Sequence, residues 1–236
     1  MPGSVFLIPT FLYEHAVETI PSYVMDAVKQ CEVFFVENER TARRYLKLFW
    51  REMVIDEYKW FTIHKAETEV QQAFIQLLKD GKNIGIISEA GCPGVADPGQ
   101  LLVNVAHKAE ATVKPLVGPS SILLALMASG MNGQKFQFVG YLPIETAARK
   151  IALKELENES AKKNCTQIFI ETPYRNNQLI KQIVETCKPQ TQFCIAADIT
   201  APSETIVTKT IIEWKKQLPD MHKRLAIFLI WSDGVF

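Results

Sequence analysis

The sequence predicts an α/β protein with a parallel sheet in its first half and a mixed sheet in its second half. In residues 1–117, short apolar runs typical of buried strands alternate with segments whose apolar residues recur at helical spacing. Such alternation favours parallel strands covered by helices. Later in the chain, expected strands follow one another directly, which favours a mixed sheet. Hydrophobic residues make up 47% of the 236 residues, which is enough to bury a core.

Each element expected in residues 1–117 rests on its own pattern. The strands are short apolar runs at 4–8, 33–36, 84–87 and 113–117. The first helix, 21–30, has one apolar face formed by Ile20, Val24, Ala27 and Val28. Further helices are expected at 41–49, 67–78 and 101–108. Asp80-Gly81 ends the helix 67–78.

Gly118-Pro119 interrupts this pattern, so we place a domain boundary near residues 114–118 and expect domains 1–117 and 118–236. Ser120 can cap a helix that runs to Ser129 and ends at Gly130. Further helices are expected near 147–157 and 175–186. Strands are expected at 136–141, 167–170, 192–199, 205–210 and 224–231.

Composition narrows the class of protein. The net charge is zero, so a polyanionic partner must be held by a local patch. The five cysteines, 31, 92, 165, 187 and 194, form no C-x-x-C pair, which favours reduced thiols and a cytoplasmic location. The four histidines, 15, 64, 107 and 222, are isolated, and we expect no metal site. The sequence has no basic leader and no apolar run long enough to span a bilayer, so we expect neither a signal peptide nor a membrane anchor.

Residues 88–99 form the most informative segment. The apolar run 84–87 stops at Ser88 and Glu89, and the next ten residues contain three Gly and two Pro. Glycines let backbone groups approach a ligand closely, and open α/β sheets place ligands where a strand passes into such a loop. The alternative is an ordinary connector between a strand and a helix.

Several common sites are absent from the sequence. The first strand is followed by Pro-Thr-Phe-Leu-Tyr13 rather than a Gly-rich turn, which argues against the usual dinucleotide-binding fold. The sequence also lacks the H-E-x-x-H, G-x-S-x-G and Walker lysine motifs.

Basic side chains recur on one side of the helix expected at 41–49. Spacings of three, four and seven bring together Arg40, Arg43, Arg44, Lys47 and Arg51. In a neutral chain this stripe suits the phosphate backbone of RNA, and we expect Arg40, Arg43, Arg44 and Lys47 to bind such a substrate. The alternative is a solvated face paired locally with Glu37 and Glu39.

Five segments in order along the chain resemble one enzyme family. Residues 88–99 resemble its "SDAGTPxISDPG" motif, and residues 37–41 resemble "AEDTR". Residues 117–130, 138–143 and 169–175 resemble "PGPSAxxxALxxSGL", "FxGFLP" and "FYESPHR". The family is the class III S-adenosylmethionine (SAM)-dependent methyltransferases, the tetrapyrrole methylase superfamily. The strongest resemblance is to its ribosomal RNA small-subunit methyltransferase I branch, which methylates a ribose 2′-hydroxyl.

The resemblance implies two α/β domains with a cofactor cleft between them, SAM as cofactor and a homodimer. It also implies cofactor contacts from Pro9, Ala90, Gly91, Val95, Ala96, Asp97, Ser120, Ser121, Tyr141, Leu142, Thr172 and Tyr174. Asp97 has an alternative role as a turn residue before Pro98, and Ser120 has one as a helix cap.

Methyl transfer to a hydroxyl needs a base to take up the proton. Glu89, where the branch has Asp, is the first candidate for that catalytic role, and Glu171 is the second. Either carboxylate is alternatively structural, for example through a pair with Arg175.

The chain departs from the branch in its last third. Where the branch has "ARELTKxxE", the Arg, Glu and Lys become Ala197, Asp198 and Ala201. Where the branch has "GEMVLIV", the Gly and Glu become Lys223 and Arg224. Methylation of RNA is therefore the first hypothesis. Methylation of a small molecule such as a tetrapyrrole, and non-catalytic binding of SAM or a nucleotide, remain as alternatives.

Overall fold

Five strands in the first part of the chain form one parallel sheet, in the order β3-β2-β4-β1-β5. The computed structural model describes residues 2–63 and 68–232. The strands are β1 (Ser4–Ile8), β2 (Val33–Val36), β3 (Lys59–Thr62), β4 (Ile84–Ile87) and β5 (Thr112–Pro115). β2 and β4 are buried along their whole length, as expected for parallel strands covered on both faces.

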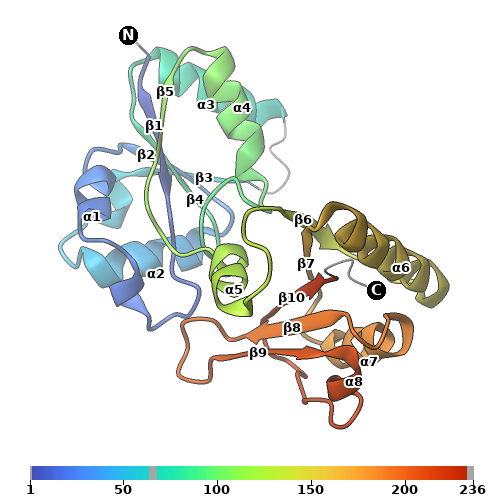
Figure 1. Ribbon diagram of the computed structural model, residues 1–236. Coiled ribbons are helices and arrows are strands. Elements are labelled where there is room, and N and C mark those ends of the chain that lie inside the picture. The colour runs from blue at the N-terminus through green and yellow to red at the C-terminus, as the bar shows by residue number, and fades with distance from the viewer. Residues whose placement is uncertain (1, 64–67, 233–236) are drawn as a thin grey trace. The chain divides into compact units, whose positions relative to one another are not determined.

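Two pairs of helices cover the two faces of this sheet (Figure 1). On one face, α1 (Tyr23–Val28) and α2 (Glu39–Phe49) pack against Phe6, Ile8 and Phe34. On the other face, α3 (Thr68–Lys79) and α4 (Gly99–Lys108) pack against residues such as Phe35 and Ile86. Short 3₁₀ turns lie at Val17–Thr19 and Ile55–Glu57.

The second part of the chain forms a mixed sheet in the order β6-β7-β10-β8-β9. β6 and β7 are parallel, and the other neighbours are antiparallel. The strands are β6 (Phe136–Tyr141), β7 (Thr166–Ile170), β8 (Gln192–Ala197), β9 (Thr205–Thr210) and β10 (Ala226–Trp231).

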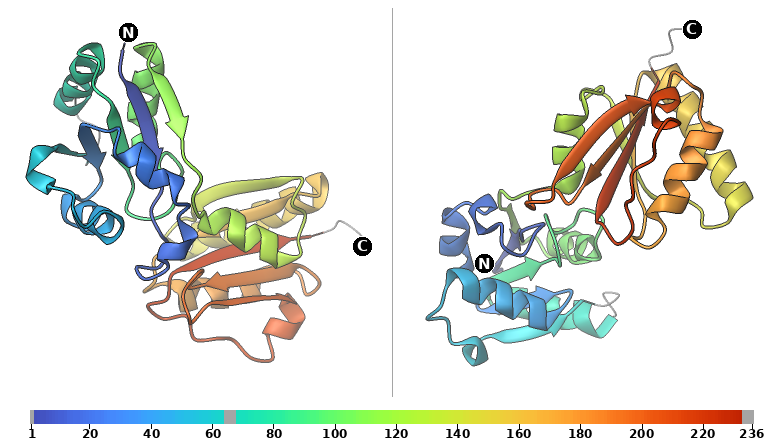
Figure 2. Two further views of the ribbon diagram at one scale, coloured as in Figure 1. Left: turned by 90° about the vertical axis from the view of Figure 1, so that its left-hand side faces the viewer. Right: turned by 90° about the horizontal axis from the view of Figure 1, so that it is seen from below.

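Helices cover both faces of this sheet as well. The helices are α5 (Ser121–Ser129), α6 (Thr146–Lys163), α7 (Asn176–Thr186) and α8 (Ile211–Trp214). α6, α7 and α8 enclose the main apolar core of this part, in which Phe169, Phe193 and Phe228 are fully buried. α5 contacts β8, β9 and β10 from the opposite face, as Figure 2 shows.

The predicted fold class is confirmed, because the first sheet is parallel and the second is mixed. The chain divides into two units, Met1–Ser120 and Ser121–Phe236. The sequence analysis placed its domain boundary after residue 117. None of the helices in the described part of the chain combines the length and apolar character that a membrane crossing requires.

Some elements differ from the sequence-based expectation. The sequence analysis did not predict the edge strand β3 or the one-turn helix α8, since four residues give too little periodicity to recognise. α6 continues to Lys163 rather than 157, because its last turns are polar and show no apolar stripe. β5 lies at Thr112–Pro115 instead of 113–117, and α1 is shorter than 21–30. The predicted start of α3 at residue 67 lies outside the described residues.

Candidate functional site

The carboxyl ends of β1, β2 and β4 carry the segments that the sequence analysis selected. β4 is the central strand and lies between β2 and β1. The chain passes from β1 and β2 to helices on one face of the sheet, and from β4 to α4 on the other face. In open parallel sheets a ligand crevice forms where neighbouring strands send their connections to opposite faces. The loop after β4, residues 88–98, therefore begins where this fold favours ligand binding.

Backbone hydrogen bonds join the loop after β4 to the loop after β1. The N–H of Thr10 donates to the carbonyl of Gly91 at 2.9 Å, and the N–H of Gly91 donates to the carbonyl of Thr10 at 3.2 Å. Gly91 has a φ of +75°, and a Cβ there would lie 3.3 Å from the carbonyl oxygen of Pro119. Since side chains rarely adopt this conformation, glycine is the residue that fits here.

A second close approach involves Pro9, one of the predicted cofactor residues. A Cβ at Gly118 would lie 2.1 Å from the Cβ of Pro9. The backbone at Gly118 therefore packs directly against the Pro9 ring, and there is no room for a side chain at position 118. The carbonyl of Pro9 accepts a hydrogen bond from the Tyr45 hydroxyl at 2.5 Å. Pro9 is therefore buried and fixed from two sides.

Asp97 closes the loop on itself. Both of its carboxylate oxygens accept from the N–H of Gly94 at 2.9 Å, and Oδ1 accepts from the N–H of Gly99 at 2.7 Å. Burial raises the pKa of Asp97 above its ordinary value, although these hydrogen bonds act in the opposite direction. Asp97 thus has the turn role that the sequence analysis left open, and its contact with a cofactor stays a prediction.

The remaining loop residues leave their backbone accessible. Ala90, Val95 and Ala96 are exposed, and Ala96 has a φ of +60°. Among described residues, no acceptor receives a hydrogen bond from the N–H of Ala90 or Ala96. These two N–H groups are free to donate to a ligand.

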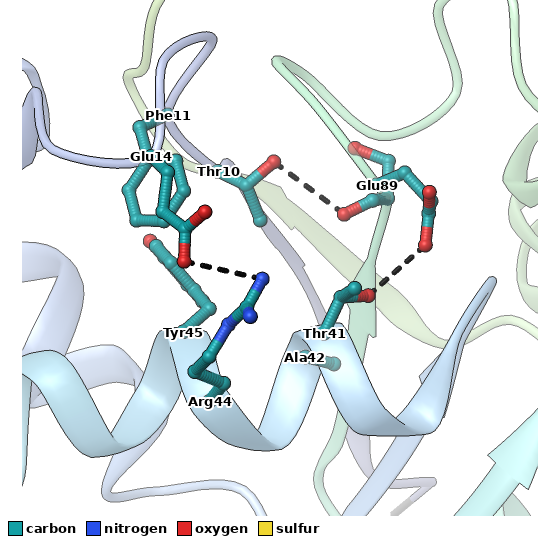
Figure 3. A pocket seen from close by; sticks show the side chains of 9 residues that line it. Thr10, Phe11, Glu14, Thr41, Ala42, Arg44, Tyr45 and Glu89 are labelled. Carbon is teal, nitrogen blue, oxygen red and sulfur yellow. Dashed lines mark hydrogen bonds and ion pairs between the residues drawn. The ribbon is translucent and has the colours of Figure 1, made fainter.

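A small pocket beside this loop, with a cavity volume of about 90 Å³, contains Glu89 (Figure 3). Its other walls come from the loop after β1 and from the first turns of α2. The Thr41 hydroxyl donates to Oε1 of Glu89 at 3.0 Å, and Oε1 of Glu37 accepts from the Glu89 N–H at 2.9 Å. The Glu89 carboxylate is exposed, and Thr41 is its one side-chain hydrogen-bond partner among the described residues, so it keeps capacity to accept a proton.

Glu37 lies behind Glu89 and is partly buried. Burial raises the pKa of Glu37, and the negative charges of Asp97 and Glu89 raise it further. The hydrogen bond from the Glu89 N–H acts in the opposite direction. The segments after β2 and β4 therefore concentrate negative charge at this edge of the sheet, and such charge favours a positively charged ligand.

The basic stripe is partly neutralised. Arg43 forms an ion pair with Glu39, and its guanidinium lies 5.1 Å from the centre of the Trp60 ring. Arg44 pairs with Glu14 at 3.2 Å, across the pocket wall in Figure 3. Among described residues, Arg40 has no ion-pair partner. Local pairing with Glu39, part of the alternative, thus applies to Arg43, whereas Arg44 pairs with the distant Glu14. RNA contact by the stripe stays a prediction.

Lys47 differs from the other members of the stripe. Its ammonium donates to the carbonyl of Arg51 at 2.7 Å, so it closes the C-terminal end of α2. It remains exposed, and substrate contact by Lys47 also stays a prediction.

Glu171, the second candidate base, is a buried structural carboxylate. Its Oε1 accepts from Nε and Nη2 of Arg175 at 2.9 and 2.7 Å, and from the N–H of Thr172 at 2.7 Å. Its Oε2 lies 3.6 Å from Nη2 of Arg149. The side chain is 2% exposed. This geometry favours the pairing with Arg175 that the sequence analysis kept as an alternative.

The other predicted cofactor residues of the second unit differ in exposure. Tyr141 and Tyr174 are 62% and 72% exposed, whereas Leu142 is buried and Thr172 is half-buried. α5 begins at Ser121, directly after Ser120, which agrees with the expected helix start.

The two segments that depart from the branch contact each other. Nε of Arg224 donates to Oδ2 of Asp198 at 2.7 Å, and Lys223, where the motif has Gly, keeps a φ of +62°. Asp198 and Thr200 also have positive φ, at +52° and +71°. Asp198 and Arg224, which both differ from the branch motifs, thus pair with each other in this structure.

Sequence reasoning missed three residues of these networks. Thr41 and Glu37 belong to a recognised motif segment, and Asn38 marks the helix start by accepting from the N–H groups of Arg40 and Thr41. Asn38 is a residue type that commonly caps helices, so the sequence alone could have placed Thr41 in the first turn of α2. Arg149 lies in a polar stretch, and nothing in the sequence distinguishes it from a surface arginine.

Metal ligands do not gather in the part of the chain that the structure describes: no three His, Cys, Asp or Glu side chains there could hold an ion together. His64 lies outside the described residues. The other three histidines are exposed.

Comparison with known proteins gives several relatives that share one name. The chain is 31% identical over 188 residues to the ribosomal RNA small subunit methyltransferase I of Vibrio cholerae, a match that covers 79% of this chain and 62% of that protein. It is 35% identical to the protein of that name from Buchnera aphidicola subsp. Schizaphis graminum, with 66% and 54% covered. The chain thus spans less than two thirds of the length of these relatives. The Escherichia coli O157:H7 protein is 26% identical, with 97% and 77% covered.

Solved structures of low sequence identity share the fold. The methyltransferase CobJ matches with a TM-score of 0.64 and 16% identity, covering 98% of this chain and 94% of that chain. Uroporphyrin-III-C-methyltransferase from Thermus thermophilus matches with a TM-score of 0.57 and 15% identity, covering 99% and 94%.

The family model described as "Tetrapyrrole (Corrin/Porphyrin) Methylases" matches residues 17–214, which include all five recognised motif segments and four of the five strands of each sheet. The matched range contains the loop of residues 88–98 and its exposed carboxylate Glu89. The chain therefore belongs to the tetrapyrrole methylase family.

Proposed function

We propose that this protein is a SAM-dependent methyltransferase that uses Glu89 as its general base. The observation that carries the proposal is the exposed Glu89 carboxylate, which lies two residues after the central strand β4 and inside the segment that resembles the family's motif. Glu89 is preferred over Glu171, because Glu171 is buried between two guanidinium groups. A base must reach the acceptor hydroxyl, and only an accessible carboxylate can do so.

The residues of the loop fit a cofactor of this kind. The free N–H groups of Ala90 and Ala96 can donate to polar atoms of a ligand, and the carboxylates of Glu37, Glu89 and Asp97 favour a positive charge. When bound, SAM supplies a methyl group already activated by its sulfonium. The protein then has to align the acceptor and take up its proton.

Residues from both units belong to the proposal. In the first unit these are Pro9, Ala90, Gly91, Val95, Ala96, Asp97 and Ser120. In the second unit we propose Ser121, Tyr141, Leu142, Thr172 and Tyr174.

We propose RNA as the acceptor, with a ribose 2′-hydroxyl of ribosomal RNA as the target. The relatives' names support this substrate, and the exposed Arg40 offers a charge for a phosphate group. A small molecule such as a tetrapyrrole is the second candidate, which the pairing of Arg43 and Arg44 favours. A homodimer and a cytoplasmic location complete the proposal.

Calorimetry with SAM and S-adenosylhomocysteine tests the cofactor. We expect saturable binding of both compounds, and the absence of heat with either would overturn the proposal. Incubation with the methyl-labelled donor and ribosomal small subunits then tests the acceptor. Binding of both compounds without label in RNA or in a small-molecule extract would identify a non-catalytic binder.

A charge reversal separates the two acceptors. Arg40→Glu should weaken RNA methylation and leave donor binding unchanged, because its side chain has no partner in the described part of the chain. Lys59→Glu, at another exposed basic position in this unit, is the control. Equal activity of wild type and Arg40→Glu on RNA would argue against this contact. Light scattering tests the homodimer.

A further inference from the structure

Arg149 is the largest fully buried side chain of the described residues, and the proposed chemistry does not use it. It lies in the first turn of α6, whose N-cap residue Glu145 accepts from the N–H groups of Ala147 and Ala148. A positive charge near a helix N-terminus is unfavourable for the helix dipole. Helix stability therefore does not explain an arginine at this position.

The guanidinium of Arg149 instead contacts two segments that follow neighbouring parallel strands. Nε donates to the carbonyl of Pro143 at 2.7 Å and Nη2 donates to that of Ile144 at 2.9 Å, both after β6. Nη2 also lies 3.6 Å from Oε2 of Glu171, directly after β7. Nη1 donates to Oε1 of Gln182 on α7 at 2.8 Å. Each nitrogen of the side chain is thus used.

The segment after β6 needs such a contact, because the strand ladder does not hold it. The pairing of β6 with β7 shifts in register between Phe138 and Tyr141, and Gly140 has a φ of +71°. Such an irregularity interrupts ladder bonds and redirects the chain. Beyond it, the carbonyls of Pro143 and Ile144 are held by the arginine.

Glu171 extends the network into the second segment. It accepts from Arg175 and from the N–H of Thr172, so one carboxylate fixes the turn that leads to α7. The charges are linked in the order Arg149, Glu171, Arg175. Removal of Arg149 would therefore disturb both segments together.

We infer that Arg149 is a positioning residue that fixes residues 141–144 against residues 171–175, and so sets the second unit's contribution to the cofactor site. The inference rests on the proposed function, since Tyr141, Leu142, Thr172 and Tyr174 are the proposed cofactor residues in these segments. Arg149 itself acts only through them.

Arg149→Lys tests the inference, because lysine keeps the charge but lacks the planar fork that reaches both carbonyls and the carboxylate. The matched control is Arg224→Lys. Arg224 fixes another loop of the same unit through comparable contacts, at 2.7 Å to Asp198 and 2.7 Å to the carbonyl of Ser203.

The first readout is amide hydrogen exchange without ligand, followed by mass spectrometry of peptides that cover the two segments. We expect faster exchange in residues 141–145 and 171–176 in Arg149→Lys, and no change in residues 141–145 in Arg224→Lys, whose carbonyl contacts only the second segment, through Asn176. Equal exchange in the two variants would overturn the inference.

The second readout is the dissociation constant of S-adenosylhomocysteine. We expect it to rise about tenfold or more in Arg149→Lys, because displaced contacts lose their alignment, and to stay near wild type in Arg224→Lys. Wild-type affinity in Arg149→Lys would overturn the inference. If wild type binds neither SAM nor S-adenosylhomocysteine, the proposed function fails, while exchange still decides whether Arg149 fixes the segments.

Gln182→Leu provides a milder variant should Arg149→Lys not fold. It keeps the arginine and removes only the acceptor of Nη1. We expect changes in the same two peptides, smaller than those in Arg149→Lys, and their absence would count against the network.

Discussion

The segments after β4 and after β7 each carry a glutamate within two residues of the end of the strand, yet the two segments are held in different ways. Backbone hydrogen bonds between Thr10 and Gly91 fix the loop after β4, and Glu89 stays exposed. Charged side chains fix the segment after β7, and Glu171 is buried among them.

The difference separates two uses of one residue type. A carboxylate is available for proton transfer where the main chain provides the support, as at Glu89. Where the carboxylate is itself the support, as at Glu171, its oxygens are already occupied. The substitutions below test this contrast, in order of decreasing expected effect.

Glu89→Gln should lower the rate of methyl transfer by about 10²-fold or more, because the amide cannot take up the acceptor's proton. Donor affinity and the free energy of unfolding should stay near wild type, since the side chain is exposed. Single-turnover kinetics with labelled donor measures the effect. An unchanged rate would remove Glu89 from the mechanism.

Glu171→Ala should lower the free energy of unfolding by about 3–5 kcal/mol, because it leaves the buried Arg149 without its counter-charge. Urea unfolding of this variant is to be compared with Glu89→Ala, for which we expect a change within about 0.5 kcal/mol. Equal free energies of unfolding for Glu171→Ala and Glu89→Ala would contradict the structural role of Glu171.

Gly118→Ala should lower the free energy of unfolding by about 1–3 kcal/mol, because its Cβ would overlap Pro9. Gly133→Ala is the matched control, since a Cβ there has no neighbour within 4 Å among the described atoms. Wild-type stability of Gly118→Ala would mean that the backbone at position 118 does not lie as close to Pro9 as the structure indicates.

Asp97→Ala should cost about 1–2 kcal/mol of stability, because the N–H groups of Gly94 and Gly99 lose their acceptor. Thermal unfolding, with the exposed Asp56→Ala as control, measures it. A loss of donor affinity larger than the loss of stability would add cofactor contact to the turn role of Asp97.

Glu37→Gln should change the pH dependence of stability. Because the folded-state pKa of Glu37 is raised, its contribution is fully present below the ordinary value of 4.5 and is lost as pH rises through the raised pKa. The melting temperature of wild type should therefore fall relative to Glu37→Gln as pH rises above 4.5. The exposed Glu52→Gln is the control, and an opposite trend would contradict the stated cause.

Much of the fold was predictable from local pattern. β1, β2, β4, β6 and β9 have the predicted limits, because apolar runs and turn residues mark their ends. The loop after β4 was predictable because its glycines and prolines exclude regular structure. By contrast, β3 is a short, half-exposed edge strand. Its local sequence shows no pattern that predicts its pairing with β2.

The role of each carboxylate was not predictable. Glu89 and Glu171 both follow apolar strands, and their difference arises from Arg149, 22 positions before Glu171 in the sequence, and from Thr41, 48 positions before Glu89. Such contacts depend on tertiary structure. The contact of Arg43 with the Trp60 ring was unpredictable for the same reason, because Trp60 lies on β3, which the sequence analysis did not predict.

The ion pair between Arg224 and Asp198 has an evolutionary consequence. The motifs that residues 196–204 and 223–229 resemble have an arginine at 197 and acids at 198 and 224, whereas this chain has Ala197 and carries its cation at Arg224. Without a cation at 197 or at 224, acids at 198 and 224 would repel each other. We therefore expect positions 197 and 224 to covary, and Arg224→Glu alone to be less stable than the double variant Ala197→Arg with Arg224→Glu.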